Sequence, residues 1–488
     1  MDALLTTTSG QVRGTRRQLP GFDSFAFLGI PYAEPPVGPL RFAAPQPRGR
    51  WDGVLDATMP GSTPQRRPFA DVTTIPEPSV PGDDILNVSV FTPDPGAAGL
   101  PVLVWIHGGG YLAGSPASPW YDGAAFNRDG VVTVNLSYRL GHQGFGTVPG
   151  AVANRGVLDW LAALRWVQDN IAAFGGDPSK VTIAGQSAGG GAVLHLLALA
   201  SGQGLFRSAL SASGVTRTLS ADEGRRRAER VARAAGVPCT LEGFHSLTED
   251  QLLDAQAAAV PEVTGIDVLR QAVADSAIPS PVVDGEVVPT APLDAFASGA
   301  GAGVPLMMGA ADDEFSPMAR AAASDLEPLG NLGALAALGM TPDAAVRYAE
   351  ANADAATQGA VRLAGRAVTD AMFRTVVPLV AQHRDPETTW AYRWSLPSIA
   401  SGLAEHCHDL PSLFDCLSAP DVDAFAGAEP PQRLADELHG AAVRFVTDGD
   451  PGWAPWGGTR TARTLGQDVR DMPGAFDSTN EAVALRGA

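Results

Sequence analysis

The stretch that most constrains this chain is residues 181–190, which read VTIAGQSAGG. The pattern predicts a short apolar strand, a tight turn at Ser187 and a helix over residues 188–200. A backbone turns this sharply only where the flanking residues are small, as Gly185 and Gly189 are. The turn exposes the serine hydroxyl, and the N–H groups that begin the helix favour negative charge beside it. We therefore expect a nucleophilic serine between a strand and a helix.

Composition limits the kind of protein that can carry this turn. The chain has 488 residues, 45% of them hydrophobic and 18% charged, which is enough for one large α/β domain. Its net charge of −19 makes nucleic acid or an anionic membrane a poor partner. The cysteines, Cys239, Cys407 and Cys416, are odd in number, which speaks against a disulfide framework. With no basic leader and no long apolar run, we expect a cytoplasmic protein without a membrane anchor.

Strand and helix patterns alternate along the chain. Alternation predicts a half-buried strand at 83–93, and apolar runs predict strands at 101–106, 131–135, 304–309 and 390–394. Helical spacing is found at 156–174 and 434–446. The proline-rich residues 10–51 are typical of an edge hairpin and a surface wrap. Residues 215–300 and 317–385 are Ala-rich and predict helical insertions that cover the site. The alternation predicts an α/β fold with a large central mixed, mostly parallel sheet, helices on both faces, and a single catalytic domain over 1–488.

Because the chain holds 55 glycines, a turn like that at Ser187 also arises by chance, so the other catalytic groups must be found. A serine hydroxyl attacks a carbonyl only when a histidine takes its proton, and a carboxylate must orient that histidine. The segment AADDEF at 310–315 follows a predicted strand and offers three acids, namely Asp312, Asp313 and Glu314. The histidines that follow are His383, His406, His408 and His439. Loop context favours His406 or His408, and spacing alone leaves both open.

The tetrahedral intermediate of acyl transfer also requires N–H donors for its oxyanion. The glycines of HGGG at 107–110 follow a buried strand, and Ala188 follows the serine, so both are candidates. The triplet His406-Cys407-His408 suggests zinc, but it lacks a CxxC or HExxH spacing, and we expect no metal and no cofactor. A Cys407–Cys416 disulfide stays open, although a reducing compartment disfavours it.

Several stretches together are similar to the type-B carboxylesterases, a branch of the α/β-hydrolases. They are FLGIPYAEPPVGPLRF at 27–42, HGGG at 107–110, YDG at 121–123, residues 154–176, the GxSxG stretch and GDP at 449–451. The resemblance implies Ser187 as nucleophile, Glu314 as acid and His406 as base. The family pattern HxxELP matches residues 406–411 with Asp409 in place of Glu, which leaves His408 a bystander. By the same matching, Gly109, Gly110 and Ala188 resemble the family's oxyanion donors.

Three departures from the family pattern concern the substrate and the loops. Gln186 stands where many relatives have Glu, which removes a negative charge beside the nucleophile and weakens the case for choline esters. Phe315 replaces the usual glycine after the acid. The family's EDCL is DDIL at 83–86, so the disulfide that secreted relatives build from that cysteine is impossible here.

The resemblance and the residues together predict a serine carboxylesterase that hydrolyses uncharged carboxylic esters through an acyl-enzyme. Its partner is a small-molecule ester, and we expect a monomer or a small homo-oligomer. A carbamate or amide hydrolase with the same triad is the first alternative. A non-catalytic cholinesterase-like binding protein is the more distant one, because such relatives have lost the nucleophile.

Overall fold

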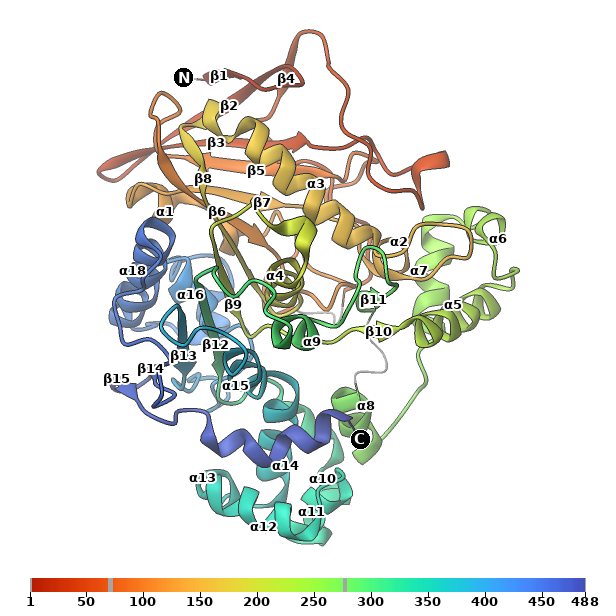
Figure 1. The fold of residues 1–488 in the computed structure, drawn as a ribbon, viewed down its shortest axis with the longest axis vertical. Helices are drawn as coiled ribbons and strands as arrows, with labels where there is room; N and C mark the ends of the chain where they lie inside the picture. Colours follow the sequence, from red (N-terminus) through yellow and green to blue (C-terminus); the bar gives the residue numbers. More distant parts are fainter. Residues whose placement is uncertain (1, 69–72, 275–278, 488) are drawn as a thin grey trace.

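The computed structural model describes residues 2–68, 73–274 and 279–487, and its centre is one large twisted sheet (Figure 1). In spatial order the strands of this sheet are β1 (Asp2–Thr6), β2 (Gln11–Leu19), β3 (Phe22–Pro31), β5 (Asn87–Thr92), β7 (Val132–Leu136), β6 (Leu100–Ile106), β8 (Gly176–Gln186), β9 (Ser208–Ala212), β12 (Leu306–Ala311), β13 (Thr389–Trp394), β14 (Ala462–Leu465) and β15 (Val469–Met472). A separate pair of parallel strands, β10 (Leu219–Ser220) and β11 (Val282–Val283), lies outside it. Strand β4 (Val54–Asp56) pairs with β2. From β7 to β14 the strands are parallel, and antiparallel strands complete both edges.

The central strands are buried on both faces, as their continuous apolar sequences predict. In β6, Val102, Val104 and Ile106 point into one hydrophobic core. Leu103 and Trp105, which alternate with them, point into a second core on the opposite face. Because successive side chains of a strand point to opposite faces, one short apolar segment serves both cores.

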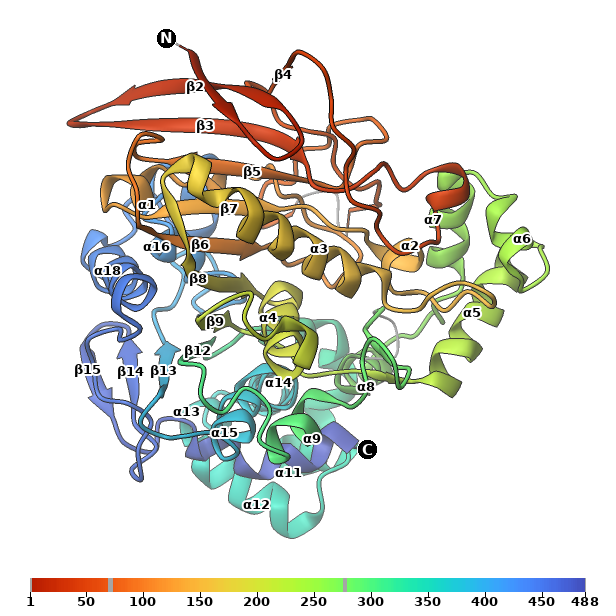
Figure 2. The same ribbon diagram turned by 45° about the horizontal axis from the view of Figure 1, so that its top comes forward.

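Helices cover each face of the sheet (Figure 2). On one side α3 (Arg155–Asn170) and α4 (Ala188–Ala198) supply Trp160, Leu164, Val193 and other apolar side chains to the first core. On the other side α18 (Gln432–Asp448) and α16 (Leu410–Leu413) pack on the second core. The predicted α/β layering is therefore present.

The remaining helices lie in the connections. Near the sheet are α1 (Ala124–Arg128), α2 (Gly141–Phe145), α9 (Pro292–Ala297), α15 (Val376–Ala381) and α17 (Val422–Ala426). One helical group contains α5 (Ala221–Ala235), α6 (Leu241–His245), α7 (Glu249–Ala258) and α8 (Ile266–Ala274). The other contains α10 (Ala323–Leu326), α11 (Gly330–Ala337), α12 (Pro342–Ala351), α13 (Ala353–Ala356) and α14 (Ala360–Thr369), which continues into a π-helical turn, η7 (Asp370–Arg374). The second group forms the lower part of the molecule in Figure 1.

Several elements differ from the sequence expectation. The strand predicted at 83–93 is the shorter β5, and it is nearly all buried rather than half-buried. The strand predicted at 304–309 is shifted to Leu306–Ala311, since Pro305 has no N–H to donate to a ladder. The helix predicted over 156–174 ends at Asn170 and finishes as a 3-10 turn. Strands β1, β4, β9, β14 and β15 were not predicted, because each is short and mixes polar with apolar residues. Across the described ranges, no helix has both the length and the apolar character that a membrane crossing needs.

Candidate active site

Ser187 lies at the carboxyl end of the central strand β8, directly before α4. Its backbone has φ 58° and ψ −124°, a combination that costs free energy for a residue with a side chain. The motif requires its two glycines because other backbone segments of the protein approach them closely. A Cβ on Gly185 would lie 2.5 Å from the carbonyl carbon of Gly189, and one on Gly189 would lie 2.0 Å from the Ile106 carbonyl oxygen. The turn therefore has the sharp, strained form that the sequence predicts.

The three candidate acids follow β12, and the structure separates their roles. Asp312 forms hydrogen bonds of 2.7 and 3.0 Å with Arg393. Asp313 forms ion pairs with Arg362 at 2.6 Å and with Arg366 at 3.2 Å. These two acids are therefore committed to arginines, and Glu314 is the remaining candidate.

Glu314 contacts His406, and His406 Nδ1 donates a short hydrogen bond to Glu314 Oε2. The second carboxylate oxygen, Oε1, accepts from the Ser213 hydroxyl at 2.7 Å and from the Ala311 N–H at 2.7 Å. The backbone N–H of His406 also donates to the Glu314 carbonyl at 3.1 Å. Both carboxylate oxygens are thus held, and the imidazole ring is oriented from its Nδ1 side.

The other ring nitrogen of His406, Nε2, faces the region of the nucleophile. It lies 3.1 Å from Gln186 Nε2, which donates to it when the imidazole is neutral. Ser187 and His406 border the same cavity, although no hydrogen bond joins the two side chains among the described residues. Such catalytic hydrogen bonds are often formed only once a substrate is bound.

The surroundings of His406 affect its ionisation in two directions. Burial opposes the charged imidazolium, but the neighbouring Cys407 sulfur and the Glu314 carboxylate favour it, and they raise the pKa of His406 well above its ordinary value. The rings of Phe315 and Phe373 lie 5.0 and 4.8 Å from the imidazole, measured between ring centroids. The ring is therefore shielded from water on sides that Glu314 does not occupy.

The predicted oxyanion donors border the same cavity as Ser187. Ala188 is the first residue of α4, so its N–H has no partner within the helix. Gly109 and Gly110 have φ 108° and 58°, and within the described parts of the chain no group accepts from their N–H groups. Three backbone donors are therefore available beside the serine.

The cavity has a volume of about 290 Å³. Its apolar wall is formed by Ile75, Tyr121, Val215, Phe315, Met372 and Phe373. Sequence reasoning missed the contributions of Ser213, Phe373 and Glu77 to the site. Ser213 follows β9, one of the strands that were not predicted, and the other two come from segments far from the motifs in sequence.

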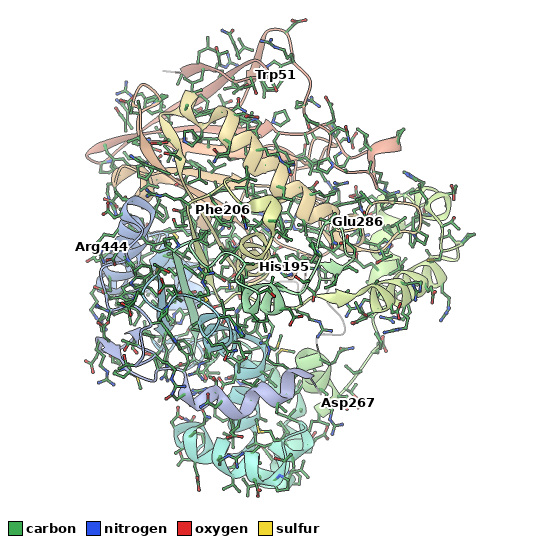
Figure 3. All side chains as sticks on the ribbon, in the orientation of Figure 1. Trp51, His195, Phe206, Asp267, Glu286 and Arg444 are labelled. Atoms are coloured by element: carbon green, nitrogen blue, oxygen red, sulfur yellow. The ribbon has the colours of Figure 1, made fainter. Side chains whose placement is uncertain are left out.

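His408 is not directed at Glu314. It is buried between the aromatic rings of Trp394 and Phe425, at centroid distances of 5.7 and 5.2 Å, and burial lowers its pKa to about 4. His439 contacts Asp129 at 3.0 Å, and His383 lies beside Gln382. His195, on α4 and labelled in Figure 3, is buried, and its Nδ1 is 2.8 Å from the Gly191 carbonyl oxygen.

All three cysteines are free thiols, so the Cys407–Cys416 disulfide is not formed. Cys407 lies next to His406, with a φ of 69°, and borders the cavity. Among residues 2–68, 73–274 and 279–487, no group of three or more His, Cys, Asp or Glu side chains is arranged to hold a metal ion.

Comparisons with known proteins identify the family to which the chain belongs. The model of the carboxylesterase family matches residues 1–464. The para-nitrobenzyl esterase of Bacillus subtilis is 34% identical over 92% of this chain and 90% of its own length. The fumonisin B1 esterase of Sphingopyxis macrogoltabida is 32% identical over 91% of this chain and 82% of its own.

Solved structures show the same similarity over the whole fold. A PNB esterase superimposes with a TM-score of 0.82 at 29% identity, covering 99% of both chains. A Geobacillus stearothermophilus carboxylesterase gives a TM-score of 0.82 at 30% identity, covering 98% of this chain and 99% of the other. The chain therefore belongs to the carboxylesterase family and is a carboxylic ester hydrolase with the α/β-hydrolase fold.

Proposed function

We propose that the protein is a serine carboxylesterase that cleaves uncharged carboxylic esters through an acyl-enzyme. Ser187 is the nucleophile, His406 the base and Glu314 the acid, with Gly109, Gly110 and Ala188 as oxyanion donors. The observation that carries this proposal is the position of His406. Its Nδ1 donates to a fully held Glu314, and its Nε2 faces the cavity that Ser187 borders.

In the first half of the reaction, Ser187 Oγ attacks the ester carbonyl while His406 Nε2 takes the hydroxyl proton. Before this transfer, the serine hydroxyl replaces Gln186 Nε2 as the donor to that nitrogen. Glu314 stabilises the imidazolium through Nδ1, and the backbone donors stabilise the oxyanion. His406 returns the proton to the leaving alcohol, which leaves the acyl group on Ser187.

In the second half, His406 takes a proton from water, and the resulting nucleophile attacks the acyl-enzyme carbonyl. The tetrahedral intermediate collapses when His406 protonates Ser187 Oγ, which releases the carboxylic acid. No step requires a cofactor. A carbamate or amide would follow the same route, and the cavity wall decides between these substrates.

We further propose that residues 1–488 work as a single catalytic domain. The two helical insertions both contribute to the cavity wall, through Val215 and Ser280 from the first and Met372 and Phe373 from the second. These side chains converge on the cavity that Ser187 borders. Catalytic and substrate-binding groups thus come from segments along most of the chain.

Hydrolysis of p-nitrophenyl butyrate tests the triad. We expect Ser187→Ala and His406→Gln each to lower kcat on the order of 10⁵-fold or more. His408→Gln is the matched control, because it makes the same chemical change two positions along the same loop, and it should keep kcat within about threefold. Loss of activity in His408→Gln with activity kept in His406→Gln would contradict the assignment. Full activity of folded Ser187→Ala would overturn the mechanism.

A further inference from the structure

The cavity wall contains one carboxylate that the triad does not use. Glu77 is the sole acidic side chain among the described residues that line the cavity, and most of the other lining groups are apolar side chains or backbone. Its side chain is 13% exposed, and it pairs with Arg66, which is 5% exposed. A charged group at this depth needs partners that compensate for its lost hydration.

The partners of Glu77 are unevenly distributed between its two oxygens. Oε2 accepts from Arg66 Nε at 3.2 Å and from the Gly114 N–H at 3.0 Å. In the described parts of the chain, no group donates to Oε1. The carboxylate is thus fixed through Oε2, and Oε1 accepts a hydrogen bond from none of the described residues.

The same contacts tie Glu77 to the loop that carries the oxyanion donors. Gly114 has φ 92°, and a Cβ there would lie 2.3 Å from the Gly108 carbonyl oxygen, so this loop folds tightly onto itself. Ser115 Oγ donates to the Pro78 carbonyl at 2.7 Å, next to Glu77 in sequence. Glu77 Oε1 is therefore held at a fixed position relative to the loop of the oxyanion donors, and so relative to the ester carbonyl that Ser187 attacks.

Arg66 balances the charge of Glu77 without competing for the cavity. Its Nη2 donates to the backbone carbonyls of Glu77 at 2.7 Å and Pro78 at 3.3 Å, and its Nη1 donates to that of Pro64 at 3.3 Å. The opposite charges of Arg66 and Glu77 make the ion pair neutral as a whole. Because the guanidinium Nη groups donate to backbone carbonyls, the pair still presents an acceptor, Glu77 Oε1, to the cavity. A neutral O–H or N–H donor satisfies that acceptor without bringing an unpaired charge into the cavity.

We propose that this esterase selects esters that carry a hydroxyl or N–H group away from the scissile bond, bound by Glu77 Oε1. The inference rests on the proposed function, since it places this donor in the cavity where Ser187 attacks the ester. A hydrogen bond to a charged acceptor changes binding by about tenfold or more. Replacing the donor with a methyl ether removes that bond and leaves Oε1 facing apolar atoms.

The experiment measures kcat/KM for hydroxyl and methoxy esters in two series. In the first series, butyrate is esterified with matched alcohols that end in either a hydroxyl or a methoxy group. In the second series, the hydroxyl or methoxy group is carried by the acyl chain instead. We expect the hydroxyl ester to be favoured by about tenfold in at least one series. In Glu77→Gln the amide oxygen can still accept from Gly114 while the amide N–H groups face the cavity. The preference should therefore disappear or reverse.

Glu34→Gln is the matched control. Glu34 accepts from Arg48 at 2.9 Å and from the Gly49 N–H at 2.8 Å, the same combination of partners, but it does not line the cavity. Its variant should keep the parent's preference.

Two failures are distinguishable in this design. If the parent shows no Ser187-dependent hydrolysis of p-nitrophenyl butyrate, the proposed function itself is wrong. If that activity is present but both series show equal kcat/KM for hydroxyl and methoxy esters, the role of Glu77 is overturned. The same holds if Glu77→Gln keeps the parent's preference while circular dichroism shows it to be folded.

Discussion

The two sides of the active-site cavity are held in place by different means. On the side of the proposed acid and base, Asp312 pairs with Arg393 and Asp313 pairs with Arg362 and Arg366, so the residues before Glu314 are tied to several other segments. On the Glu77 side, Glu77 has one buried ion pair in the described chain, with Arg66, and the pairs of the neighbouring Arg67 with Asp250 and Asp254 are exposed. Several buried ion pairs therefore hold the first side, and one buried ion pair among the described residues holds the second.

Asp313 shows what the heavier cross-linking achieves. Its N–H donates to the Ala404 carbonyl at 2.9 Å, and its carboxylate accepts from the Ala404 N–H at 3.3 Å. The loop that carries Glu314 is thus joined to the loop that carries His406, two residues before that histidine. An acid and a base must keep hydrogen-bond distance to function, whereas a wall that contacts substrate tolerates movement. We infer that the ion pairs are concentrated where the chemistry requires precision.

The largest effect is expected from Glu314→Gln. An amide N–H facing His406 Nδ1 favours the tautomer that carries its proton on Nε2, and this tautomer cannot accept the serine proton. By analogy with the equivalent change in serine proteases, kcat should fall on the order of 10⁴-fold while the fold is kept. Steady-state hydrolysis of p-nitrophenyl butyrate measures it. A fall of less than tenfold would mean that Glu314 is not the acid.

Next in size is the stability effect of Asp313→Ala, compared with Glu77→Ala. Removing Asp313 leaves Arg362 and Arg366 without their shared partner in the interior, and we expect the free energy of unfolding to fall by about 3–5 kcal/mol. Arg66 keeps its three backbone carbonyls when Glu77 is removed, so that variant should lose about 1–2 kcal/mol. Denaturant unfolding of both variants measures the difference. Equal losses would contradict the comparison between the two sides.

The sequence predicted the parts of the site whose constraint is local. The turn at Ser187 and the glycines at 107–110 are recognisable because tight backbone geometry restricts which residues fit. The choice of Glu314 over Asp312 and Asp313 was not available from spacing. It depends on arginines that lie 49–81 residues further along the chain and that pair with the other two acids.

The parts of the fold that sequence reasoning missed are those whose stability comes from neighbours. Strand β9, SALSA, has little apolar periodicity of its own, yet it lies fully buried between β8 and β12. Without that strand, Ser213 could not be placed beside Glu314. Glu77 was missed for the same reason, because its partners Arg66 and Gly114 are set by loop packing.

The third effect concerns the oxyanion loop and Gly109→Ala. A Cβ at this position would lie 2.2 Å from the Ala113 carbonyl oxygen, and φ 108° is strained for alanine, so the N–H donors of the loop must shift. Losing an oxyanion donor costs about 10²–10³-fold in kcat. Gly21→Ala is the control, because Gly21 has φ 86° and open space around it, and its kcat should match the parent's. An unchanged kcat in Gly109→Ala would remove this loop from the mechanism.

The smallest effect is a shift in pH dependence caused by Gln186→Glu. His406 must be neutral to accept the serine proton, and its pKa is already raised, so activity should increase with pH above the ordinary histidine range. A carboxylate 3.1 Å from Nε2, in place of the amide, stabilises the imidazolium further. The acidic limb of the kcat/KM profile should therefore move upward by about one pH unit.

Gln186→Met separates the charge from the lost hydrogen bond. It removes the donor to neutral His406 Nε2 without adding charge, so its acidic limb should move upward by less than that of Gln186→Glu. If His406 sets the limb, Gln186→Glu must shift it further upward than Gln186→Met does. If both profiles coincide with the parent's, another group controls the limb, and the side of the cavity that is most heavily cross-linked would not be the one that sets the pH dependence.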